Sequence, residues 1–182
     1  GVLTGKPLGY WGSQARTEAT GYGTVYFVKH LLADKNDTFE GKKVAVSGSG
    51  NVAIYAMEKA TELGATVITC SDSSGFVYDP EGIDVALVKE LKEKNRERIS
   101  KYVETRKGAT YYDKESVWDF ETAYDIALPC ATQNEINKKQ AAILVKNGVK
   151  VVAEGANMPC TLEAVAVFAK SDRKSTRLNS SH

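Results

Sequence analysis

Residues 48–53 read Gly48-Ser49-Gly50-Asn51-Val52-Ala53, a run of the GxGxxA form. In this form the first glycine permits a tight turn, the second lets a pyrophosphate approach the backbone, and the small third residue lets a helix pack closely on a strand. The run is weak evidence alone, but here it follows the apolar run 44–46, opens a helical pattern over 52–63, and precedes Asp72 by about 20 residues. This context predicts a dinucleotide-binding turn that contacts its cofactor through Gly48, Ser49, Gly50, Asn51 and Val52.

Strands and helices alternate along the rest of the chain. The patterns predict strands at 44–46, 66–70, 125–129 and 149–153, and helices at 16–33, 52–63, 84–105, 137–147 and 161–169. Strands that are continuously apolar and alternate with helices indicate a sheet buried on both faces. We therefore expect an α/β fold of the Rossmann-like, doubly wound kind. Its sheet should be mostly parallel with helices on both faces, in one domain over 1–171 that is incomplete at its C-terminal side.

Polar clusters follow each predicted strand. They occupy residues 48–51, 71–75, 129–134 and 154–157. Ligands of doubly wound sheets bind at the carboxyl ends of the strands. The four clusters therefore predict one ligand site, with Cys130 and Cys160 both near it because they follow neighbouring strands.

Composition excludes several classes of function. Lysine plus arginine (24) nearly balances aspartate plus glutamate (23), which argues against a nucleic-acid or membrane-surface partner. No apolar run approaches the roughly 18 residues of a membrane span. Three widely spaced cysteines and two histidines argue against a disulfide framework, a metal site and histidine catalysis, and favour a reducing cytoplasm.

Six runs in a fixed order carry a specific resemblance. They are TGK at 4–6, ARTEATGYG at 15–23, GSGNVA at 48–53, SDSSG at 71–75, DIALPCATQNE at 125–135 and VAEGANMP at 152–159. Together they resemble the hexameric glutamate dehydrogenases, over residues from Gly1 to about Lys170. Gly21 and Gly23 also have a simpler reading, in which they only permit close helix packing.

The resemblance implies oxidative deamination of L-glutamate to 2-oxoglutarate and ammonia, and its reverse, by a homohexamer. It assigns substrate contacts to Thr4 and Arg16. It assigns cofactor contacts to Asn51 and to residues near the nicotinamide, which are Thr20, Ala131, Thr132 and Asn157. It places the catalytic lysine and aspartate upstream of Gly1, so that no catalytic residue is expected in this chain.

The choice between NADP and NAD depends on the end of the second strand. An acidic residue such as Asp72 usually accepts a ribose 2′-hydroxyl and repels a 2′-phosphate. SDSSG nevertheless resembles the NADP-using members, because Ser73 and Ser74 can donate to phosphate oxygens and Lys92 and Arg98 match basic residues that supply positive charge. We expect NADP rather than NAD, with a solvated helix face as the alternative role of Lys92 and Arg98.

The last residues, 172–182, do not continue the resemblance. Asp172-Arg173-Lys174-Ser175-Thr176-Arg177-Leu178-Asn179-Ser180-Ser181-His182 has no apolar periodicity and resembles the in-frame translation of a DNA adapter used in short-read sequencing. We expect this segment not to be native. Cys160, which stands where the family usually carries a threonine, is a further departure.

Two other functions are compatible with the residues. A leucine, phenylalanine or valine dehydrogenase would share the fold, although CATQNE and GANMP favour glutamate. A non-catalytic nucleotide-binding module would share the glycine-rich turn without the reaction.

Overall fold

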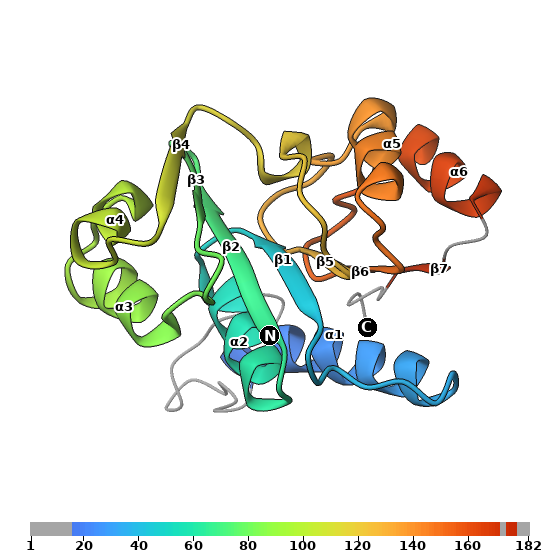
Figure 1. The fold of residues 1–182 in the computed structure, drawn as a ribbon, viewed down its shortest axis with the longest axis horizontal. Helices are drawn as coiled ribbons and strands as arrows, with labels where there is room; N and C mark the ends of the chain where they lie inside the picture. Colours follow the sequence, from blue (N-terminus) through green and yellow to red (C-terminus); the bar gives the residue numbers. More distant parts are fainter. Residues whose placement is uncertain (1–15, 172–173, 178–182) are drawn as a thin grey trace, which may run out of the picture.

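A computed structural model describes residues 16–171 and 174–177, with side chains over 19–171. One seven-stranded sheet runs through the molecule in the order β4-β3-β2-β1-β5-β6-β7 (Figure 1). The strands are β1 Lys43–Ser47, β2 Thr66–Asp72, β3 Gly75–Tyr78, β4 Thr110–Asp113, β5 Ile126–Pro129, β6 Val151–Glu154 and β7 Lys174–Arg177. The strands β2, β1, β5, β6 and β7 are mutually parallel, whereas β3 lies antiparallel to β2 and β4.

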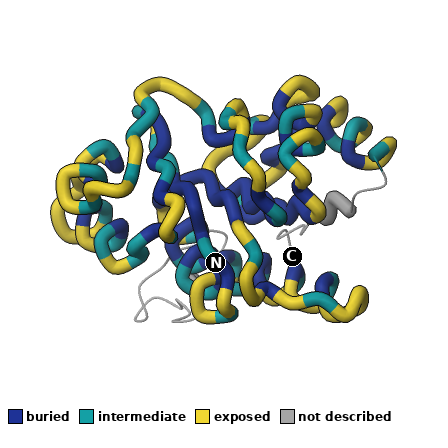
Figure 2. The backbone as a smooth tube through the Cα atoms, viewed as in Figure 1, coloured by how far each residue is buried: buried dark blue, intermediate teal, exposed yellow. Residues whose placement is uncertain are grey.

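Helices cover both faces of this sheet, as the sequence predicts. They are α1 Arg16–Ala33, α2 Asn51–Glu62, α3 Val85–Lys89, α4 Tyr102–Thr105, α5 Lys138–Lys146 and α6 Leu162–Lys170. Alternate strand residues belong to different cores: Val44 and Val46 pack with α1 to α4, whereas Ala45 packs with α5 and α6. The buried strands form the centre of the molecule in Figure 2. The predicted α/β class with a mostly parallel sheet is therefore confirmed. No described helix is long and apolar enough to cross a membrane.

The two antiparallel strands were not predicted. β3 and β4 form a sheet edge of four residues each, paired from Gly75 opposite Asp113 to Tyr78 opposite Thr110. Cross-strand rings stabilise this edge, since Phe76 stacks on Tyr112 with their centroids 4.7 Å apart. The antiparallel pair carries the chain back across the end of β2, and therefore brings residues after β4 to the carboxyl ends of the parallel strands.

The continuous helix predicted over 84–105 is wrong. Asp84 does cap its start, accepting the Leu87 N–H at 3.1 Å, but α3 passes into a π-helical turn, η2 (Glu90–Lys94), and then breaks. Arg96 has φ +52, which is outside the helical region, and a 3-10 turn, η3 (Ile99–Lys101), precedes α4. Tertiary hydrogen bonds fix the break, because Ile99 and Tyr102 donate to carboxylates on the sheet side.

Residues 174–177 form a strand where we expected no element. β7 pairs with β6 from Val151 opposite Lys174 to Glu154 opposite Arg177. The free N–H and C=O groups of a sheet edge can pair with any extended backbone, whatever its side chains. The expectation that residues 174–177 form no element is therefore wrong. The origin of residues 172–182 from a sequencing adapter stays a prediction.

Candidate functional site

A cleft of about 620 Å³ opens at the carboxyl ends of the parallel strands. It lies beside β1 and β5, where the strand order reverses: β2 to β4 lie on one side of β1, and β5 to β7 lie on the other. Doubly wound sheets bind their ligands at this position. Its volume is within the range of small-molecule sites. The lining residues are Ser47, Gly48, Ser49, Gly50, Ser71, Asp72, Ser73, Gly75, Lys114, Glu115, Ser116, Val117, Trp118, Cys130, Ala131, Thr132 and Glu135.

The glycine-rich turn forms one wall of the cleft. Gly48 has φ +91, which favours glycine, and a Cβ there would make a tight contact, 3.0 Å from the carbonyl oxygen of Cys130. The Gly48 N–H donates to Ser71 Oγ at 2.8 Å, which ties the turn to the end of β2. The turn is thereby held open toward the cleft.

The first turn of α2 supplies the donors that a pyrophosphate needs. Gly50 is the N-cap, and within the described residues no side chain caps it and no acidic residue lies in the first turn. A Cβ at Gly50 would meet nothing within 4 Å, so the backbone is open on its cleft side. Free N–H groups and the positive end of a helix favour phosphate oxygens. The residues present therefore fit a dinucleotide pyrophosphate.

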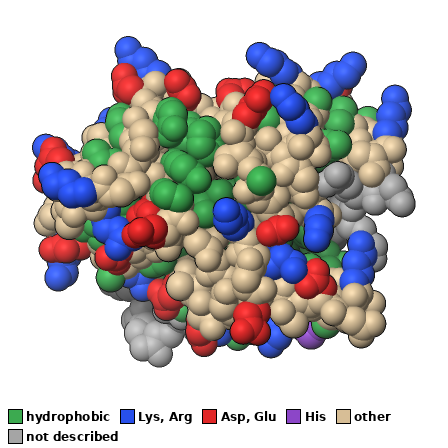
Figure 3. All heavy atoms as spheres, in the orientation of Figure 1, with side chains coloured by type: hydrophobic (Ala, Val, Ile, Leu, Met, Phe, Trp, Pro, Cys, Tyr) green, Lys and Arg blue, Asp and Glu red, His purple; other side chains and the backbone are tan. Residues whose placement is uncertain are grey.

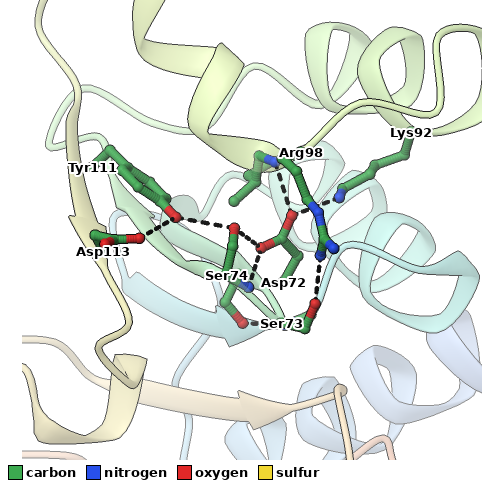
Figure 4. Close-up of polar contacts among 10 residues, drawn as sticks. Asp72, Ser73, Ser74, Lys92, Arg98, Tyr111 and Asp113 are labelled. Carbon is green, nitrogen blue, oxygen red and sulfur yellow. Dashed lines mark hydrogen bonds and ion pairs between the residues drawn. The ribbon is translucent and has the colours of Figure 1, made fainter.

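Asp72, at the end of β2, accepts four hydrogen bonds (Figure 4). Its Oδ1 accepts the N–H and the hydroxyl of Ser74, at 2.8 and 2.5 Å. Its Oδ2 accepts the Lys92 ammonium at 2.8 Å and the Ile99 N–H at 2.9 Å. The Asp72 side chain is only 8% exposed. The carboxylate is thus saturated by protein donors, and it holds the 71–75 turn and the segment around η3 together.

These donors determine the ionisation of Asp72. Burial by itself raises the pKa of the carboxyl, but the hydrogen bonds from Lys92, from Ser74 and from the Ile99 backbone outweigh it and hold the pKa well below its usual value. Asp72 is therefore ionised at neutral pH, and its charge is neutralised by Lys92.

Arg98 brings a second cation to the same turn. Its Nη1 donates to Ser73 Oγ at 2.5 Å, and Figure 4 shows the guanidinium reaching over Asp72 toward Ser73. Lys92 lies in the π-helical turn and Arg98 in the extended residue before η3, so both positions depend on the break in the predicted helix. The end of β2 consequently carries two cations against one carboxylate.

Glu135 organises the opposite side of the cleft. Its carboxylate accepts the Trp118 indole N–H at 2.8 Å and the backbone N–H groups of Ala131 and Thr132 at 3.1 and 3.4 Å. Burial raises the pKa of Glu135 above its usual value, although the donors around it oppose the shift. Glu135, the last residue of the run at 125–135, therefore holds the loop after β5 in place.

Close packing accounts for two glycines near the cleft, Gly21 in α1 and Gly155 after β6. A Cβ at Gly21, in α1, would lie 2.6 Å from the carbonyl oxygen of Val52 in α2, whereas a Cβ at Gly23 would meet nothing within 4 Å. Close helix packing therefore accounts for Gly21 and not for Gly23. A Cβ at Gly155 would lie 2.5 Å from Cys130 Sγ, so the ends of β5 and β6 also approach closely.

The predicted site residues fall into three groups. Seven line the cleft: Gly48, Ser49, Gly50, Asp72, Ser73, Ala131 and Thr132. Six lie outside the lining: Thr20, Asn51, Val52, Lys92, Arg98 and Asn157. Thr4 and the side chain of Arg16 lie outside the described residues.

The other cleft residues include one segment that no motif indicated. Residues 114–118 enter the cleft because β3 and β4 return the chain to the end of β2. The two tyrosines, Tyr111 and Tyr112, were the available signal for the strand β4. Of the two cysteines expected near the site, Cys130 lines the cleft, whereas Cys160 is buried in the core on the other face of the sheet.

Comparison with known proteins gives a consistent family. A sequence profile of the Glutamate/Leucine/Phenylalanine/Valine dehydrogenases matches residues 11–173. The NADP-specific glutamate dehydrogenase of Haemophilus influenzae is 52% identical over 174 residues, covering 94% of this chain and 38% of that protein. The NAD(P)-specific glutamate dehydrogenase of Xylanibacter ruminicola is 51% identical over 171 residues, covering 92% of this chain and 38% of that protein.

Solved structures agree with the sequence relatives. The glutamate dehydrogenase of Plasmodium falciparum superposes with a TM-score of 0.89 at 42% identity, covering 96% of this chain and 38% of that one. A hetero-hexameric glutamate dehydrogenase from Thermus thermophilus superposes with a TM-score of 0.79 at 25% identity, covering 97% and 39%. The chain thus spans somewhat more than a third of the length of the relatives that it matches.

Proposed function

Because the chain belongs to the Glutamate/Leucine/Phenylalanine/Valine dehydrogenase family, we propose that it is the nucleotide-binding part of a glutamate dehydrogenase that uses NADP(H). The whole protein would interconvert L-glutamate with 2-oxoglutarate and ammonia as a homohexamer. The bound nicotinamide would supply the hydride acceptor or donor for this reaction. The residues of this chain bind that cofactor and orient it.

The state of Asp72 is the observation that carries the choice of NADP. A free carboxylate at the end of the second strand would accept a ribose 2′-hydroxyl. Here both oxygens of Asp72 are occupied by protein donors, and Lys92 neutralises the charge. Arg98 then adds an unneutralised cation beside Ser73, which favours a phosphate over a hydroxyl.

The remaining cleft residues are assigned by position. The glycine-rich turn and the first turn of α2 would hold the pyrophosphate through backbone N–H groups. Ala131 and Thr132 would line the nicotinamide, with Glu135 keeping their loop in place. Thr20 and Asn157 would complete the nicotinamide side, while Thr4 and Arg16 would contact the substrate. NAD stays the less favoured cofactor.

A binding titration tests this proposal. We expect the purified 182-residue chain to bind NADPH weakly, but more tightly than NADH, when nucleotide fluorescence is followed. Equal affinity for the two nucleotides would contradict the NADP assignment, and binding of neither at millimolar concentration would contradict the cofactor site.

An activity assay tests whether this chain lacks the catalytic groups. The chain spans 38% of the length of the Haemophilus influenzae relative. The family resemblance assigns proton transfer to a lysine and an aspartate, and no residue of this chain matches either of them. General acid–base catalysis typically contributes about 100- to 10,000-fold. We therefore expect no amination of 2-oxoglutarate by this chain with excess ammonium. Robust turnover would show that the reacting groups have been misplaced.

A further inference from the structure

Three segments, far apart in the sequence, place a basic residue around the 71–75 turn. Lys92 comes from η2, Arg98 from the residue before η3, and Lys114 from the residue after β4. The Lys114 N–H donates to the Ser74 carbonyl oxygen at 2.7 Å, and Lys114 lines the cleft with Asp72 and Ser73. Among the described residues that line the cleft, Lys114 is the one lysine, and no sequence motif indicated it.

The charges around this turn do not cancel. Lys92 is paired with Asp72, whereas Arg98 donates to a neutral hydroxyl. Among side chains of residues 19–171, no carboxylate lies within 4.0 Å of the charged group of Arg98 or of Lys114. Arg98 is therefore an unpaired positive charge beside Ser73, and Lys114 is a second one in the cleft lining. A phosphate monoester carries about −1.5 to −2 charges at neutral pH, so that the two cations match one such group.

The backbone at Lys114 is unusual for a lysine. Its φ is +56, in the left-handed region that disfavours residues with a Cβ by about 1–2 kcal/mol. The hydrogen bond to Ser74 holds this conformation and fixes where the side chain leaves the backbone. A glycine would adopt this turn at lower cost, so the turn geometry does not account for a lysine at this position.

We propose that Lys114 is a specificity-determining residue whose ammonium contacts the 2′-phosphate of the cofactor, opposite Arg98. This inference rests on the proposed function and adds a contact that the sequence motifs do not assign. It also places the third face of the phosphate site after the antiparallel pair β3 and β4, since that pairing carries Lys114 to the end of β2.

The test isolates the adenosine end of the cofactor. Calorimetric titration compares adenosine 2′,5′-bisphosphate with adenosine 5′-monophosphate, which lacks the 2′-phosphate, on the full 182-residue chain. The variants are Lys114→Gly, which suits the left-handed backbone and removes the charge, and Lys114→Arg, which retains the charge. The matched control is Lys107→Ala, because Lys107 is exposed before the start of β4 and lies outside the cleft lining.

We expect Lys114→Gly to weaken binding of the bisphosphate about tenfold. Binding of the monophosphate should change less than about twofold, because this ligand has no 2′-phosphate for Lys114 to contact. Lys114→Arg should recover most of the bisphosphate affinity, and Lys107→Ala should behave as wild type. Thermal unfolding of each variant, without ligand, separates the loss of a contact from the loss of the fold.

Other results would overturn the assignment in distinguishable ways. If wild type prefers the bisphosphate and Lys114→Gly keeps that preference, the NADP site stands and the Lys114 contact is wrong. If Lys114→Gly loses both ligands equally, Lys114 serves the shared 5′ side instead. If wild type has no preference for the bisphosphate, the proposed cofactor choice fails together with the Lys114 contact.

Discussion

The Lys92 ammonium lies 2.8 Å from Oδ2 of Asp72, and the two side chains are 19% and 8% exposed. This ion pair changes what the acidic residue at the end of the second strand can bind. The carboxylate no longer faces a ligand as a free acceptor, because Lys92, Ile99 and Ser74 fill both of its oxygens. What remains at the strand end is a neutral pair with Arg98 beside it.

Replacing these cations should alter cofactor preference. We expect Arg98→Ala to weaken NADPH binding by about 1.5–3 kcal/mol and to leave NADH nearly unchanged. Lys92→Ala should reduce the preference for NADPH further, because it also frees the Asp72 charge to repel the 2′-phosphate. Parallel fluorescence titrations measure both effects. Equal losses for the two nucleotides in both variants would contradict the assignment.

The stability of the chain should fall in acid partly through Asp72. The folded-state pKa of Asp72 lies below its unfolded value of about 3.9, so its contribution is present above that pH and is lost as pH falls below it. Asp72→Asn removes this contribution. The stability difference between wild type and Asp72→Asn, from urea unfolding, should therefore be largest near neutral pH and shrink below about pH 4. Exposed Asp119→Asn is the control. A difference that does not vary with pH would rule out this linkage.

Gly21 and Gly23 form a matched pair on α1. Gly21→Ala forces a Cβ to 2.6 Å from the Val52 carbonyl oxygen, so we expect a loss of about 1–3 kcal/mol in the free energy of unfolding. Gly23→Ala has open space and should stabilise the helix, by up to about 1 kcal/mol. Urea denaturation of both variants measures these changes in the free energy of unfolding. A harmless Gly21→Ala would mean that α1 does not approach α2 as closely as described.

The thiols should react slowly in the folded chain. Cys70, Cys130 and Cys160 are 0%, 7% and 3% exposed, and burial raises the pKa of Cys70 and Cys130. Thiol reagents attack the thiolate, so labelling requires the chain to open. We expect little labelling under native conditions, three labelled thiols in denaturant, and further slowing by NADPH because bound ligand disfavours opening. Rapid native labelling of Cys130 would show that the floor of the cleft is accessible.

Much of the central sheet was predictable from local patterns. The runs at 44–46 and 125–129 are short and fully apolar, which is typical of parallel strands buried on both faces. The GxGxxA run fixed the first strand–turn–helix unit. The helices predicted to begin at Asp84, Asn137 and Thr161 do begin there, and each of these side chains caps its helix by accepting a backbone N–H.

The missed features depend on contacts between distant residues. The break after Lys94 is held by Ile99 and Tyr102, whose acceptors Asp72 and Asp79 lie 27 and 23 residues earlier in the chain. The pattern of apolar residues within 84–105 carries no information about those partners. Lys114 was missed for the same reason, because only the pairing of β3 with β4 brings it to the end of β2.

The π-helical turn at Glu90–Lys94 makes the number of residues in this segment a determinant of the direction in which Lys92 points. A π turn holds about one residue more than an α turn, and each residue of an α-helix advances by about 100°. Deleting one residue ahead of Lys92, with the start of α3 kept in place, would rotate its side chain by roughly that angle around the helix axis, away from Asp72. The released carboxylate would then suit a ribose hydroxyl. A single codon deletion, with no substitution in the cleft, would therefore remove the neutralising partner of Asp72 from the end of β2.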